Sequence, residues 1–183
     1  MGIGAADSPR NDGGAPPDSV ERQLLRDPYI TMFRRPSALT STIEQLSELG
    51  YDVRATDAST WAGVREMHPA LADLLDFPDY YGHNLDALND CLSDVAEGTY
   101  GVRRDARGLA LVLWHYDAFA AANGRAAFSL LDSFTVQARA AAVAGRRMLC
   151  LVQSDDPQLS FPPVGATPVP WNGTEWQVAQ RDS

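Results

Sequence analysis

Cysteine is scarce in this sequence, and long apolar runs are absent. Only Cys91 and Cys150 occur among 183 residues, each in an apolar segment where a reduced, buried thiol is the expected state. No run of 18 or more apolar residues exists, which excludes an ordinary transmembrane helix. Residues 1–18 also lack the charged start and apolar stretch of a signal peptide. We therefore expect a cytoplasmic protein without a disulfide bond.

The usual signatures of enzymes are missing as well. The sequence contains no glycine-rich phosphate loop, paired Cys-x-x-Cys, HExxH or nucleophile elbow. Its three histidines are too few and too scattered to indicate a catalytic triad. His115 follows a predicted core strand and His68 precedes Pro69 on a predicted surface, so only His83 lies beside other polar candidates. We expect no catalytic activity, no cofactor and no metal.

Basic residues are fewer than acidic residues. Lys and Arg total 15 against 24 Asp and Glu, which gives a formal net charge of -9 and a sequence pI of about 4.6. Such a chain repels a nucleic-acid backbone and an anionic membrane, so a basic protein is the favoured partner. Acidic composition also serves solubility alone. Where the charges lie therefore matters more than their sum.

Composition divides the chain into three parts. Residues 1–27 are rich in Gly, Pro, Asp and Ser and predict a disordered leader. Residues 28–155 carry regular apolar patterns and are long enough for one packed domain. Residues 156–183 form a Pro-rich C-terminal tail, although Trp171, Trp176 and Val178 indicate that part of it packs back onto the domain.

Apolar periodicity predicts strands that alternate with helices. We expect strands at 29–33, 51–56, 109–114 and 148–152. We expect helices at 37–49, 64–75, 85–95 and 126–144. Pro69 predicts a break or a late start in the second helix, which residues 58–60 could cap. The uninterrupted apolar run 109–114 predicts a strand that is buried on both faces. Because helices separate the predicted strands, the fold class is α/β, with a small parallel three- to four-stranded sheet covered by helices.

The helix that begins after Asn84 is clearly two-sided. Its core side carries the stripe Leu85, Leu88, Cys91, Leu92 and Val95. Its other side carries Asp86, Asn89, Asp90 and Ser93. Asn84 is a good N-cap, and Asp86 in the first turn gains from the helix dipole. Asp90 gains less and lies four residues from a like charge, an unfavourable spacing on a helix.

Three interpretations of this polar side remain open. Carboxylates on a rigid helix, with Asn89 between them and a tyrosine pair nearby, make a receptor for arginine or lysine side chains of a partner. The same residues also suit an ordinary solvated helix face. A third interpretation takes His83, Asp86, Asp90 and Asp94 as metal ligands, although one helix face seldom encloses an ion.

The stretch from Phe77 to Leu92 resembles the barstar family of ribonuclease inhibitors. It combines an aromatic pair, a glycine, an N-cap asparagine and a Leu-Asp-Ala-Leu core followed by Asp-Cys-Leu, a combination that rarely coincides by chance. The resemblance extends more weakly over residues 51–152. The leader, residues 29–49 and the tail lie outside it.

The resemblance implies an inhibitor that inserts one helix and its adjoining loop into the active site of a microbial ribonuclease. Asp90 would occupy the phosphate site, and Asp86 would pair with a neighbouring arginine of the enzyme. Tyr80 would stack near the catalytic histidine, while Gly82 and Asn84 would shape the contacting loop. The expected partner-binding residues are therefore Tyr80, Gly82, Asn84, Asp86, Asn89 and Asp90.

Two departures from the family pattern affect which partner the chain would bind. Asn89 replaces a tryptophan of the barstar binding helix, and Arg139-Ala140-Ala141 stands where barstar offers a glutamate. The first hypothesis is a ribonuclease inhibitor or toxin-immunity protein whose partner is a basic extracellular-type ribonuclease or nuclease toxin. The alternative is a barstar-fold module that binds a different basic protein or toxin without inhibiting a ribonuclease. In either case we expect neither nucleic acid nor membrane as partner, and a monomer when free.

Overall fold

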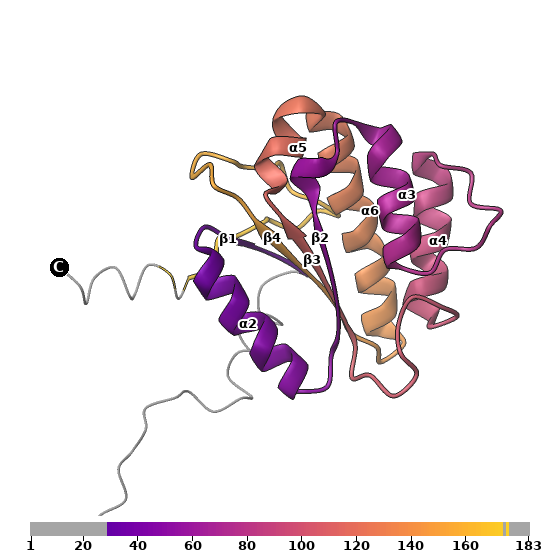
Figure 1. The fold of residues 1–183 in the computed structure, drawn as a ribbon. Coiled ribbons are helices and arrows are strands. Elements are labelled where there is room, and N and C mark those ends of the chain that lie inside the picture. Colours follow the sequence, from indigo (N-terminus) through magenta and orange to yellow (C-terminus); the bar gives the residue numbers. More distant parts are fainter. Residues whose placement is uncertain (1–28, 174, 176–183) are drawn as a thin grey trace, which may run out of the picture.

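Strands and helices alternate along the computed structural model, which describes residues 29–173 and 175 (Figure 1). The strands are β1 (Ile30–Phe33), β2 (Asp52–Asp57), β3 (Leu109–Trp114) and β4 (Met148–Gln153). The helices are α2 (Pro36–Glu48), α3 (Val64–Leu74), α4 (Leu85–Glu97), α5 (Tyr116–Ala122) and α6 (Gly124–Val143), with a 3-10 turn, η1 (Ala58–Thr60). The predicted leader, residues 1–27, lies outside the described residues.

The four described strands form one parallel sheet in the order β1-β4-β3-β2. The register pairs Leu109 of β3 with Met148 of β4, and Asp57 of β2 with Trp114 of β3. Parallel neighbours require crossover connections, which the helices between the strands provide. The predicted α/β class and parallel sheet are confirmed, and the sheet has four strands.

Burial of β3 on both faces, as the sequence predicts, places it at the centre of the molecule. Leu109, Leu111 and Leu113 belong to the larger apolar cluster, on the side of α3, α4, α5 and α6. Ala110 and Val112 alternate with them and belong to a second cluster beneath α2. Figure 1 shows this division, with α2 on one side of the sheet and the other helices on the opposite side.

Helix α2 covers its face of the sheet with an apolar stripe. Leu39 and Leu46 are fully buried and share the second cluster with Phe33 of β1 and Tyr51. The N-cap Arg35 makes no side-chain cap, but the carboxylate of Glu175 accepts hydrogen bonds from the N–H groups of Arg34 and Arg35, both at 3.0 Å. A carboxylate at this helix N-terminus satisfies two backbone N–H donors and interacts favourably with the positive end of the helix dipole.

The predicted break in α3 is wrong. The helix runs without interruption from Val64 to Leu74, with Pro69 inside it. Proline at this position removes the bond that its N–H would make to the carbonyl of Arg65, but that residue lies in the exposed first turn, where water can satisfy it. His68, predicted on the surface, is 3% exposed because it lies on the inward side of α3.

The residues before α3 also differ from the prediction. Residues 58–60 do not cap α3 but form the separate turn η1, in which the carboxylate of Asp57 accepts the N–H of Ser59 at 2.9 Å. Gly63 stands at the N-cap of α3 without a side-chain bond. The short helix α5 had no counterpart in the sequence prediction.

Part of the C-terminal tail packs onto the domain, as Trp171 indicates. Leu159, Phe161, Val169 and Trp171 pack against the larger cluster. Trp171 also pairs with Met32 of β1, because the N–H of Met32 donates to Pro170 and its carbonyl accepts from Asn172. Trp176 and Val178 lie outside the described residues.

Both cysteines are buried free thiols, and burial raises the pKa of Cys150 well above its ordinary value. Every helix in the described ranges is too short or too polar to cross a lipid bilayer.

Candidate partner-binding site

Helix α4 is capped at both ends and buried along one side, which fixes its ends and its orientation. The Asn84 side chain accepts the N–H of Ala87 at 2.8 Å, and Gly98 ends the helix in the left-handed region at φ 74°. The predicted core stripe is confirmed, since Leu88, Cys91, Leu92 and Val95 are at most 4% exposed, while Leu85 is half-buried. Burial of this stripe fixes which side of α4 faces solvent.

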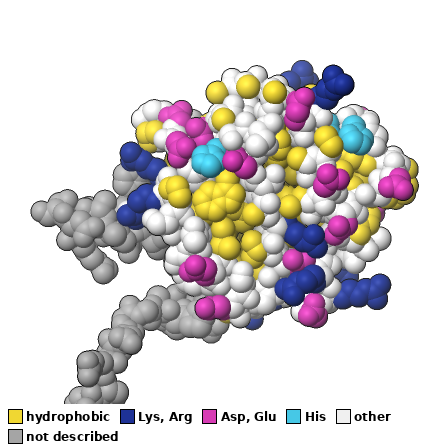
Figure 2. All heavy atoms as spheres, in the orientation of Figure 1, with side chains coloured by type: hydrophobic (Ala, Val, Ile, Leu, Met, Phe, Trp, Pro, Cys, Tyr) yellow, Lys and Arg dark blue, Asp and Glu magenta, His cyan; other side chains and the backbone are white. Residues whose placement is uncertain are grey.

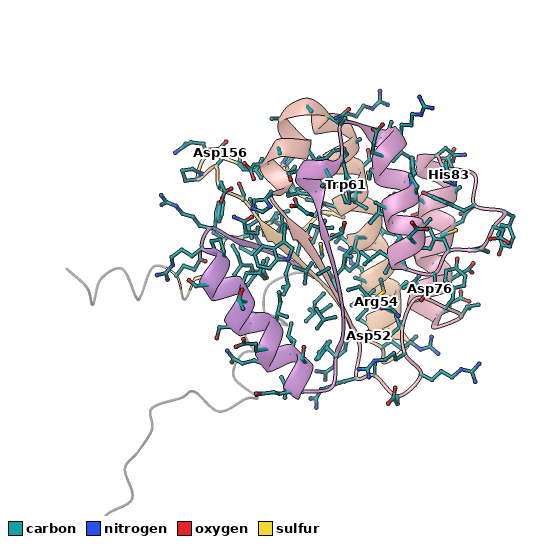
Figure 3. The ribbon with its side chains drawn as sticks, in the orientation of Figure 1. Asp52, Arg54, Trp61, Asp76, His83 and Asp156 are labelled. Carbon is teal, nitrogen blue, oxygen red and sulfur yellow. The ribbon has the colours of Figure 1, made fainter. Side chains whose placement is uncertain are left out.

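The opposite side of α4 is acidic and open to solvent. Asp86 and Asp90 are exposed and lie one turn apart. Among the described residues, no arginine or histidine pairs with either carboxylate. The ion pairs found there join Arg54 and Arg103 to Asp52 of β2, Arg54 also to Asp76 after α3, and His115 to Asp57. Figure 3 labels Asp52, Arg54 and Asp76 of that separate network. We call the side of α4 that carries Asp86, Asn89 and Asp90 the acidic face.

Helix α6 completes the acidic face. Nε2 of Gln137 donates to Oδ1 of Asn89 at 3.0 Å, so Asn89 is half-buried and fixed between the two helices. A hollow of about 340 Å³ lies beside this bond. It is lined by Leu85, Asp86, Asn89, Asp90, Ser129, Asp132 and Ser133. Three carboxylates therefore converge on a small polar hollow that contains no cation of the described chain.

Asp132 is a residue that the sequence prediction missed. Its Oδ1 accepts the N–H of Gly165 at 2.7 Å, which ties the C-terminal segment to α6. Helical spacing from the buried Leu131, Phe134 and Thr135 would have turned Asp132 away from the core, but nothing in the sequence says that α6 packs beside α4. The stretch Arg139-Ala140-Ala141 lies farther along α6, where Arg139 donates to the carbonyl of Gly165.

The loop before α4 presents one tyrosine and buries the next. Tyr80 is 80% exposed, whereas Tyr81 is 5% exposed and its hydroxyl shares a hydrogen bond with Nδ1 of His68. The ring of His83 lies over Tyr81, with ring centroids 4.9 Å apart. Figure 3 places His83 on the outer side of the α3 and α4 layer. The buried Tyr81 thus anchors a loop whose outer residues, Tyr80 and Gly82, are free to contact a partner.

Acid should weaken the fold through His68. Burial first, and the charge of His83 second, lower the pKa of His68 below the ordinary value of about 6.5. The unfolded chain then takes up a proton at a pH where the folded chain does not. The free energy of unfolding is therefore unaffected by His68 above about pH 6.5 and falls as the pH drops below it.

Urea denaturation at about pH 7.5 and pH 5.5 measures this effect. We expect the wild-type protein to lose more stability between the two pH values than a His68→Gln variant does. An equal loss in both proteins would show that His68 does not carry the acid sensitivity.

The metal interpretation finds no support in the geometry. Within residues 29–173 and 175, no group of three or more His, Cys, Asp or Glu side chains is arranged to hold an ion. Asp94 has a structural role instead, because the Tyr100 hydroxyl donates to its Oδ2 at 3.0 Å.

The six predicted partner-binding residues lie on one continuous region formed by the loop and α4. Five of them are exposed, and Asn89 is the half-buried member. Asn84 and Gly82 are linked directly, because Nδ2 of Asn84 donates to the carbonyl of Gly82 at 3.2 Å. The fold thus brings the predicted residues together, and their role in binding stays a prediction.

Comparison with known proteins adds two findings. Residues 51–153 match the family model described as Barstar (barnase inhibitor). A shorter stretch is 54% identical over 37 residues to the "Putative ribonuclease inhibitor YrdF" of Bacillus subtilis (strain 168), a match that covers 20% of this chain and 41% of that protein. The family match spans β2 to β4, including α4 and its loop, and covers more than half of the chain. The chain therefore belongs to the barstar family.

Proposed function

We propose that this chain inhibits a ribonuclease by placing the acidic face of α4 in the enzyme's active site. The Asp90 carboxylate takes the position of an RNA phosphate among the enzyme's cations. The observation that carries the proposal is the pair Asp86 and Asp90, exposed on a capped helix and paired with no described cation of their own chain. The barstar family consists of inhibitors and not of enzymes, so blockade requires no chemical step.

The neighbouring residues have separate roles in this proposal. Asp86 pairs with a second arginine of the enzyme through charge-assisted hydrogen bonds. Tyr80, the most exposed aromatic side chain described, stacks against the catalytic histidine region. Gly82 and Asn84 fix the shape of the loop. The net charge of -9 steers a basic nuclease toward the inhibitor in the cytoplasm, where it protects cellular RNA.

A second candidate is an immunity module for a different basic nuclease toxin. It is favoured by Asn89, which occupies the position of a barstar tryptophan and is bound to Gln137. The exchange removes apolar contact area from the centre of the face and adds a polar hollow bordered by Asp132. A partner with a larger cationic surface than barnase would fit this face better.

Titration of the purified protein into a barnase-type ribonuclease tests the first candidate. We expect RNA cleavage to cease near one equivalent of inhibitor, with affinity and association rate that fall as salt rises. Undiminished cleavage at equimolar concentration would reject inhibition of that enzyme. Capture of one basic nuclease from the native host by the wild-type protein, and not by Asp90→Ala, would then favour the second candidate.

A further inference from the structure

A second cavity lies at the opposite end of α4 from the acidic face. It has a volume of about 430 Å³, opens to solvent and is bordered by the end of α4, the loop 98–108 and the turn before β4. Five arginines line it: Arg103, Arg104, Arg107, Arg146 and Arg147. Figure 2 shows several Lys and Arg side chains, with Asp and Glu side chains among them, at the lower right of the molecule, the end at which this loop lies.

This concentration of positive charge contrasts with the rest of the chain. All 15 cationic residues of the Lys and Arg total are arginines, and a third of them line this one cavity. None of its described lining residues is acidic, although the protein as a whole carries a net charge of -9. An arginine-lined cavity in an acidic protein indicates a site for an anion.

Backbone hydrogen bonds hold the segments that carry these arginines. The backbone N–H of Arg103 donates to the side-chain Oδ2 of Asp52 at 2.8 Å, and the N–H of Arg107 donates to the carbonyl of Gly50 at 2.9 Å. On the other side, the N–H of Arg146 donates to Ala141 at 2.8 Å. The cavity is therefore formed before any ligand arrives, which lowers the entropic cost of binding.

Glycine is required where the cavity is tightest. A Cβ at Gly98 would collide with the guanidinium of Arg146, and a Cβ at Gly108 would collide with the backbone of Arg147. Both arginines are thus packed closely against neighbouring backbone. The backbone contact at Gly108 fixes the β3 side of the cavity, whereas on the α4 side the Arg146 guanidinium can move with its side chain.

Structural roles account for part of this cluster. Nη1 of Arg146 donates to the carbonyl of Ala96 at 3.5 Å, and Nε of Arg103 lies 3.6 Å from Oδ1 of Asp52. Arg107 and Arg147 also make interactions within the chain. A guanidinium has five N–H donors and stays charged, so one internal bond leaves further donors for a ligand.

We propose that this cavity binds a small ligand with two or more linked phosphate groups, held mainly by Arg104 and Arg146. The planar guanidinium matches phosphate oxygens in pairs, which a lysine cannot do. Arg104 lies in the loop after α4 and Arg146 in the turn before β4, so a ligand with linked phosphates can present one anionic group to each side of the cavity. The cavity volume falls within the usual range for small-molecule sites.

This site is separate from the proposed inhibitory one. Asp90 and Gly98 are eight residues apart on α4, about 12 Å along the helix axis. Asp90→Ala should leave phosphate binding unchanged, and Arg104→Ala should leave ribonuclease inhibition unchanged. Failure of one proposal is therefore distinguishable from failure of the other.

Calorimetric titration of the full chain with inorganic tripolyphosphate and with ATP tests the proposal, at about 0.15 M salt without divalent cations. We expect one-to-one binding of both, and binding of inorganic phosphate that is at least about tenfold weaker. Tighter binding of ATP would identify a nucleotide as the source of the phosphates, and equal affinities would identify free polyphosphate.

Arg104→Ala and Arg146→Ala should each weaken tripolyphosphate binding about tenfold or more. Arg125→Ala, which removes an exposed arginine at the other end of α6, is the matched control and should have little effect. Because Arg104 is exposed, its loss should not unfold the protein, which the circular dichroism spectrum verifies. No binding at about 1 mM ligand, equal weakening by all three substitutions, or binding of an oligoribonucleotide alone would overturn the proposal.

Discussion

Replacing Asp90 by alanine should weaken binding to the target ribonuclease by about 2 kcal/mol or more, roughly a 30-fold rise in the dissociation constant. A capped helix holds the exposed carboxylate, and no cationic side chain of the described residues pairs with it. The carboxylate therefore breaks no internal ion pair when it binds the enzyme. Its removal leaves cations of the enzyme's active site desolvated and unpaired, which adds to the cost. A loss of this size defines an interface hot spot, and the barnase–barstar pair is the standard example of such binding. Inhibition constants from an RNA-cleavage assay measure the change.

The matched control for this experiment is Glu44→Ala. Glu44 is exposed on α2, across the sheet from α4, and its removal changes the net charge by the same amount. We expect only a small effect, confined to association rate and salt dependence. Asp94 is a poorer control because it accepts a hydrogen bond from Tyr100. Equal, small effects of Asp90→Ala and Glu44→Ala would remove Asp90 from the binding site.

Leu46→Ala should lower the free energy of unfolding by about 2 to 5 kcal/mol. Leu46 is fully buried between α2 and the sheet, in the cluster that also holds Phe33 and Tyr51. The lost methyl groups leave a cavity that the sheet cannot close. Although α2 lies outside the family-matched residues 51–153, this cost would make it an integral part of the folded domain.

Urea denaturation of wild type, Leu46→Ala and the exposed control Thr40→Ala measures this cost. Thr40→Ala should change stability by less than about 0.5 kcal/mol. If Leu46→Ala were equally harmless, α2 would contribute little to the stability of the sheet.

Much of the fold was predictable because its apolar patterns are long and regular. The continuous run in β3 could only be buried on both faces, and the helices between strands required parallel pairing. Helix α5 was not predictable, since seven residues show too little periodicity and follow the left-handed residue His115. The uninterrupted α3 was missed because a proline in the second turn is tolerated when its neighbours are exposed.

Some features of the candidate site depend on residues close together in the sequence, and others depend on residues far apart. The rotation of α4 follows from its own sequence, because Asn84 fixes its start and the leucine stripe fixes its buried side. The bond from Gln137 to Asn89 joins residues 48 positions apart, and Asp132 comes from the same distant helix. Such contacts depend on how α6 packs against α4, which periodicity within either helix does not specify.

The pairing of Trp171 with Met32 affects whether another polypeptide chain can pair with the edge strand β1. An uncovered rim strand is a template on which a second chain can extend the sheet and begin to aggregate. At β1 that place is taken, because both polar backbone groups of Met32 are bonded to the chain's own C-terminal segment. At the other edge of the sheet, β2 carries the charged side chains of Asp52, Arg54 and Asp57, which oppose pairing with a strand of another molecule. Both edges of the sheet are thus less open to strand addition by a second chain, which opposes fibre growth.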